Sequence, residues 1–161
     1  MFSRFVRTRE REVQGVGTWA SLEALERHAE VTEGALLHFN LEAAGHIDAG
    51  ADYAARHGTA RGKSLELCRN LRGTAPQLQA QHVCSPVDLC GRHDIEREAL
   101  CEGEVSDGFR EVVWEVASQA KLHLDEARRL APEVPAAARS LFLPAVPAFL
   151  YSPMILLVLF T

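Results

Sequence analysis

The sequence predicts an all-α domain, and three observations lead to this prediction. Ala, Leu, Glu and Arg dominate the 161 residues while β-branched residues are sparse, a composition that favours helix over strand. Apolar residues recur at spacings of three, four and seven, which places them on one face of a helix. Glycine and proline separate these stretches and mark helix ends. A chain of this length forms one ordinary domain with a sizeable core.

The first part of the chain predicts three helices. Residues 3–14 indicate a short charged helix, and a long helix follows that Thr18 or Ser21 can cap and Gly45 ends. Residues 48–72 are expected to form the third helix. Two glycines inside it point to close helix packing or to room for a ligand.

Gly73 and Pro76 are expected to end that helix. Residues 73–93 then predict a loop with a short extended piece at 82–84, and an aspartate cap begins a short helix over 94–101.

A strongly amphipathic helix is predicted over residues 109–130, where Pro132 and Pro135 stop it. Residues 141–161 carry no charge, but prolines interrupt them and no run approaches the roughly 20 apolar residues of a membrane span. This tail is expected to dock on the core, with contact at a membrane surface as the alternative. The inward positions expected in the amphipathic helix are Val112, Val113, Val116, Ala120, Leu122, Leu124 and Ala127.

Charge and cysteine content exclude some classes of protein. Seventeen basic against twenty-two acidic residues argue against nucleic acid as the main partner, because phosphate binding needs concentrated Lys and Arg. None of the four cysteines forms a C-x-x-C pair, and four in a chain this long are no disulfide scaffold. We expect reduced, mostly buried thiols in an intracellular compartment.

Two constellations could bind a metal ion. His82, Cys84, Cys90 and His93 are zinc-type ligands, but their spacing matches no common zinc module, so small apolar cysteines and surface histidines are the simpler interpretation. Asp48 and Asp52 stand four residues apart, yet the dipole at a helix start already favours acids there.

Several stretches resemble the squalene/phytoene synthases. ALERHAEVTEGALLHFNLEAAG resembles the family's helix of the type "LeeYa-gTa-slg-L-LeilG", GKSLELCRNLRG resembles "GiAlQltNilRD", and CSPVD resembles "YLPxD". GFREVVWEVASQAKLHLDEAR is similar to a later helix of the family. The resemblance covers residues 5–150 and implies a partial prenyl-synthase-like helical bundle.

The chain departs from the family's pattern where an active synthase carries two magnesium-binding aspartates. Counted from Arg72, those positions hold Gly73 and Gln77, and the family's Asn and Gln fall on Arg69 and Glu66. The resemblance therefore implies no second magnesium site and no stabilisation of a diphosphate leaving group. We expect no catalytic, cofactor-binding or metal-binding residues and no cofactor. The positions that do fit the family are Gly62, Arg72, Pro86 and Asp88.

The resemblance implies a non-catalytic role for this chain. It is strongest to members of the family that assist the assembly of mitochondrial respiratory complex I at the matrix side of the inner membrane, where a degenerate synthase fold would bind a subunit or a lipid. Alternatives are a prenyl-diphosphate-using synthase, a helical binding module unrelated to respiration, or a truncated isoform without independent function. Residues 1–150 would be the C-terminal half of the synthase-like domain and 151–161 an apolar, possibly truncated tail. Residues 1–14 show no convincing presequence, because acids accompany their arginines.

Overall fold

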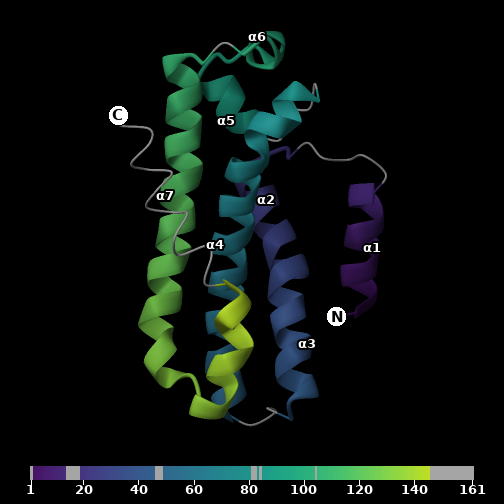
Figure 1. Cartoon of the computed structure of the whole chain (residues 1–161), viewed down its shortest axis with the longest axis vertical. Coiled ribbons are helices and arrows are strands. Elements are labelled where there is room, and N and C mark those ends of the chain that lie inside the picture. The colour runs from purple at the N-terminus through teal and green to yellow at the C-terminus, as the bar shows by residue number, and fades with distance from the viewer. Residues whose placement is uncertain are drawn as a thin grey trace.

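The computed structural model describes residues 2–13, 19–45, 49–80, 83, 85–103 and 105–145, and all regular structure within these ranges is helical. The predicted all-α class is therefore confirmed. A long central helix, α4, packs most extensively against α7, while α2 and α3 lie on its other side and α1 is outermost (Figure 1). The bounds are α1 Phe2–Val13, α2 Leu22–Ala29, α3 Ala35–Ala43, α4 Ala49–Gln79, α5 Val87–Arg92, α6 Arg97–Cys101 and α7 Asp107–Leu130.

The predicted long helix before Gly45 is present as α2 and α3 joined by a π-helical segment, η1 (Glu30–Gly34). Ser21 caps it as expected, since its Oγ accepts a hydrogen bond from the backbone N–H of Ala24 at 3.1 Å. Gly45 has a φ of 80°, the left-handed conformation that favours glycine at a helix end. The π-helical turn was not expected from the sequence.

The prediction that α4 ends near Arg72 was wrong, because the helix continues through Gly73 and Pro76 to Gln79. A glycine in a helix interior costs only about 1 kcal/mol, and proline about 3 kcal/mol. The extra turns bring Leu78 onto a cluster of Val83, Leu100 and Phe109, which offsets that penalty.

The predicted loop over 73–93 also contains α5, and the predicted aspartate cap was wrong. Asp94 instead has a φ of 49° and follows the end of α5, where Ile95 N–H donates to the carbonyl of Cys90 at 3.0 Å. This pattern is a Schellman ending, in which the left-handed residue closes a helix rather than opening one. The next helix, α6, begins at Arg97.

The helix α7 ends at Leu130 before Pro132, as predicted, and two 3-10 segments follow: η2 (Ala131–Glu133) and η3 (Ala136–Ala145). Leu122, expected to face inward, is 61% exposed. It stands two residues from the buried Ala120 and Leu124, and successive helical residues rotate by about 100°, so it points to solvent.

Within the described residues, three apolar clusters hold the helices together. The central one joins α2, α4, α5 and α7, a second packs α3 and α4 against the segment after α7, and a third lies around α6. Leu141, the first residue of the predicted tail, packs against the second cluster. The side chains of 142–145 and all of residues 146–161 lie outside the described residues, so docking of the rest of the tail stays a prediction. Among the described residues, no helix is long and apolar enough to cross a membrane.

Candidate functional site

Gly73 and Gln77 lie one turn apart on α4, and the Gln77 amide covers the space above Gly73. A Cβ placed on Gly73 would be 3.3 Å from Gln77 Nε2. Neither residue has a carboxylate that could bind magnesium. In the part of the chain that the structure describes, no group of three or more His, Cys, Asp or Glu residues is placed to hold a metal ion.

The two positions upstream on α4 form an ion-pair network instead. Arg69 donates to Glu66 Oε2 at 2.9 Å and to Glu33 Oε1 at 2.7 Å, and Arg9 of α1 donates to the same Glu33 oxygen at 3.3 Å. The Glu33 and Glu66 side chains are only 12% and 13% exposed. Burial lowers the pKa of Arg69, but the charge-assisted hydrogen bonds to the Glu33 and Glu66 carboxylates outweigh it and raise that pKa overall. The side chains of this network therefore occupy the surface of α4 that faces η1.

Of the other residues that fit the family pattern, Gly62, Pro86 and Asp88 take part in the local packing and hydrogen bonding of the helices. Gly62 lies where α4 meets η1, and Pro86 is fully buried just before α5. Asp88 lies in the first turn of α5, where it is exposed and accepts a hydrogen bond from the N–H of Leu89 at 2.9 Å. Arg72 is exposed on α4.

The zinc-type residues that the structure describes do not come together as a site. Cys90 is half-buried beside a small cavity lined largely by apolar side chains, and burial raises the pKa of its thiol. His93 Nε2 lies 2.8 Å from Glu115 Oε1 of α7, so its partner is a carboxylate. His82 and Cys84 lie outside the described residues, as do Asp48 and the side chain of Asp52.

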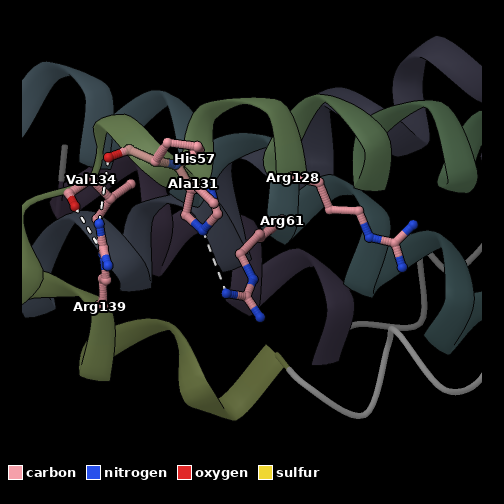
Figure 2. A pocket seen from close by; sticks show the side chains of 7 residues that line it. His57, Arg61, Arg128, Ala131, Val134 and Arg139 are labelled. Atoms are coloured by element: carbon pink, nitrogen blue, oxygen red, sulfur yellow. Dashed lines mark hydrogen bonds between the residues drawn. The ribbon is translucent and has the colours of Figure 1, made fainter.

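A cavity of about 450 Å³ lies near the other end of α4, where α7 turns into η2 and η3 (Figure 2). His57 Nδ1 lies 2.7 Å from the carbonyl of Ala127 and donates to it, which leaves Nε2 as the acceptor facing Arg61 at 3.4 Å. Burial lowers the pKa of His57 and that of Arg61. Sequence analysis did not find this site, because its residues are far apart in the chain. Its lining residues are His57, Arg61, Arg128, Ala131, Pro132, Val134 and Arg139.

This arrangement of helices around one long central helix defines a synthase-type helical bundle. The structure superposes on the crystal structure of squalene synthase HpnC from Alicyclobacillus acidocaldarius with a TM-score of 0.83, covering 99% of this chain and 60% of that one at 20% sequence identity. At that identity the match shows the fold alone. The family model for squalene/phytoene synthase matches residues 1–153, so the chain belongs to the squalene/phytoene synthase family.

The curated relatives of this chain carry the name of an assembly factor. The chain is 38% identical to NADH dehydrogenase (ubiquinone) complex I, assembly factor 6 of Mus musculus over 128 residues, which are 80% of this chain and 38% of the mouse protein. The Homo sapiens protein of that name is 34% identical over the same shares of the two chains. The homolog from Drosophila melanogaster is 33% identical over 89% of this chain and 42% of its own length. The chain thus spans well under half the length of these relatives.

Proposed function

We propose that this chain acts without catalysis in the assembly of respiratory complex I, on the matrix side of the mitochondrial inner membrane. The observation that carries the proposal is the likeness to relatives that are named as complex I assembly factors and match 80% or more of the chain. In this role the helical bundle would bind a complex I subunit or a lipid during assembly.

The chemistry of α4 supports a non-catalytic role. A prenyl synthase must bind magnesium and stabilise a diphosphate leaving group. At the corresponding positions this chain has Gly73 and Gln77, and Glu66 and Arg69 are already paired with each other and with Glu33. Opening this network to admit a diphosphate would break hydrogen bonds between charged groups, each worth about 1.5–3 kcal/mol.

Exposed apolar side chains offer a surface for a partner. Val87 at the start of α5 is 56% exposed, Val105 before α7 is 60% exposed, and Trp114 on α7 is 40% exposed.

The test is co-purification from mitochondria that express the tagged chain. We expect complex I assembly intermediates to co-purify with the bait, and we expect Trp114→Ala or Val87→Asp to reduce their recovery. Arg110→Gln is the matched control, because Arg110 is an exposed residue of α7 whose carboxylate partner, Asp107, is itself 95% exposed. A cooperatively folded bait that recovers no complex I component would contradict the proposal.

A turnover assay tests the absence of catalysis separately. With magnesium and farnesyl or geranylgeranyl diphosphate, we expect no product from the folded chain. Magnesium-dependent product formation that is lost in Arg69→Ala would overturn the non-catalytic proposal and leave the assembly role to be judged on co-purification alone.

A further inference from the structure

The cavity beside His57 is positively charged. Three arginines from different elements line it: Arg61 of α4, Arg128 of α7 and Arg139 of η3. No carboxylate lines it among the residues that the structure describes. Arg128 also pairs with Asp125 at 3.2 Å, but that side chain is 43% exposed and is not part of the cavity wall.

The backbone carbonyls around this cavity are already bound by donors. The C-terminal end of a helix such as α7 carries partial negative charge that would repel an anion. Here the Ala127 carbonyl accepts from His57 Nδ1 at 2.7 Å, and the Val134 and Pro132 carbonyls accept from Arg139 at 3.1 and 3.4 Å. These hydrogen bonds offset the partial negative charge of the three carbonyls, so the three arginines set the charge of the site.

His57 positions Arg61 without competing with it for an anion. Its Nδ1 donates to Ala127, so the neutral imidazole presents Nε2 as an acceptor to Arg61. Burial keeps the pKa of His57 below its usual range, so the ring stays neutral at neutral pH. In Figure 2, Arg61 lies in the middle of the site, with Arg139 on one side and Arg128 on the other.

We propose that this cavity binds a phosphate group, held by Arg61 and enclosed by Arg128 and Arg139. Guanidinium groups bind phosphate oxygens bidentately, and one phosphate has enough oxygens for several arginines, whereas a carboxylate has two. Arg128 is exposed, so rotation of its side chain brings it onto the ligand, and Arg139 reaches the ligand through Nη1, which takes no part in its bonds to the Val134 and Pro132 carbonyls. Ala131, Pro132 and Val134 form an apolar wall for the rest of the ligand.

The site is separate from the position of the missing aspartates. Arg61 and Gly73 are both on α4, and the helical rise places them about 18 Å apart along its axis. A ligand here is therefore independent of the lost magnesium chemistry, and it is compatible with a bundle that does no catalysis.

Titration calorimetry of the full chain at pH 7.5 tests the proposal with three probes. These are inorganic phosphate, dihexanoyl phosphatidic acid below its micelle concentration, and dihexanoylglycerol, which lacks the phosphate. We expect saturable binding of a phosphate-bearing probe and none of dihexanoylglycerol. Binding of inorganic phosphate would identify a free phosphate as sufficient, and binding of phosphatidic acid alone would identify a lipid headgroup.

Two variants and one control keep the result specific. Arg61→Gln and Arg139→Gln should each weaken binding about tenfold, because charge-assisted hydrogen bonds are lost. Arg139 is exposed, so its variant tests the site even if Arg61→Gln fails to fold. Arg92→Gln, which removes an arginine of α5 that pairs with Glu115 of α7, should bind as the parent chain does. No binding of either phosphate probe, equal weakening by Arg92→Gln, or equal binding of dihexanoylglycerol would overturn the proposal.

Discussion

Gly62 of α4 lies directly against the backbone of Gly34 at the end of the π-helical segment η1. A Cβ on Gly62 would be 2.9 Å from the Gly34 nitrogen, and 3.1 Å from the carbonyl carbon of Glu33. Real Cβ atoms essentially never show a contact of 2.9 Å, and 3.1 Å is tighter than nearly all of them; both atoms are backbone that cannot rotate away. Glycine at this position therefore sets how closely α4 approaches η1.

Gly62→Ala is expected to destabilise the protein by about 1–3 kcal/mol, because the added methyl forces α4 away from η1. The measurement is the free energy of unfolding from urea titration followed by circular dichroism. Alanine is otherwise the better helix former, so the same substitution at a glycine of α4 without such close contacts would increase the free energy of unfolding.

Gly73→Ala is the matched control on the same helix. Its Cβ would meet only the end of the Gln77 side chain at 3.3 Å, which can move aside. We expect this variant to be neutral or more stable by up to about 1 kcal/mol. Equal destabilisation by both variants would show that the close approach at Gly62 does not determine the packing.

Glu33 is expected to hold α1 onto the rest of the bundle through Arg9 and Arg69. Glu33→Gln keeps the shape but removes the charge from two hydrogen bonds at 3.3 and 2.7 Å, so a loss of about 1–2 kcal/mol is expected. Faster tryptic cleavage in α1 should accompany the loss. Glu23→Gln is the control, since Glu23 is 73% exposed and pairs with Arg27 on the surface, which predicts a change below about 0.5 kcal/mol. Unchanged cleavage of α1 in Glu33→Gln would contradict the anchoring role.

The helices whose signals are local were predictable from the sequence. Ser21 and Gly45 mark the ends of the α2–α3 stretch by cap chemistry alone, and Pro132 stops α7. The extension of α4 past Pro76 was not predictable, because it depends on Leu78 meeting residues of α6 and α7 that are remote in the chain. Tertiary packing outweighs the local break there.

The candidate site was less predictable than the fold. Gly73 and Gln77 could be assigned from the family pattern, since the pattern fixes their spacing. The pairing of Glu33 with Arg69 spans 36 residues, and the contact between His57 and Ala127 spans 70. Neither leaves a periodic signal in the sequence, so only the packing of α4 against η1 and α7 reveals them.

The thiol of Cys68 is expected to resist alkylation in the folded chain. It is buried between α4 and its neighbours, and burial raises its pKa from 9.0 to about 11. The thiolate is the reactive form, so its population at pH 8 is about a hundredfold lower than in the unfolded chain. Iodoacetamide labelling followed by peptide mass spectrometry should modify Cys68 only after urea unfolding. Rapid labelling of Cys68 in the native chain would show that the core around it opens readily.

His57 is expected to make stability depend on pH just below neutrality. Its side chain is 4% exposed, and burial together with the charge of Arg61 lowers its pKa from 6.5, although the hydrogen bond to Ala127 opposes this. As the pH falls below 6.5, the unfolded chain binds more protons at His57 than the folded chain does. The contribution of His57 to the free energy of unfolding is therefore complete above pH 6.5 and is lost as the pH falls from 6.5 toward the folded pKa.

Urea titrations of the parent chain and of His57→Gln at pH 7.5, 6.5 and 5.5 measure this contribution. Glutamine can still donate to the Ala127 carbonyl but does not titrate, so the parent chain should lose more stability than the variant between pH 6.5 and 5.5. The pKa of Glu115 is also lowered, first by the hydrogen bond from His93. Its effect on stability appears below pH 4.5, outside the range from pH 5.5 to 7.5. Parallel pH profiles for the two chains would mean that His57 accepts a proton in the folded state as easily as in the unfolded one, which would contradict the lowered pKa of His57.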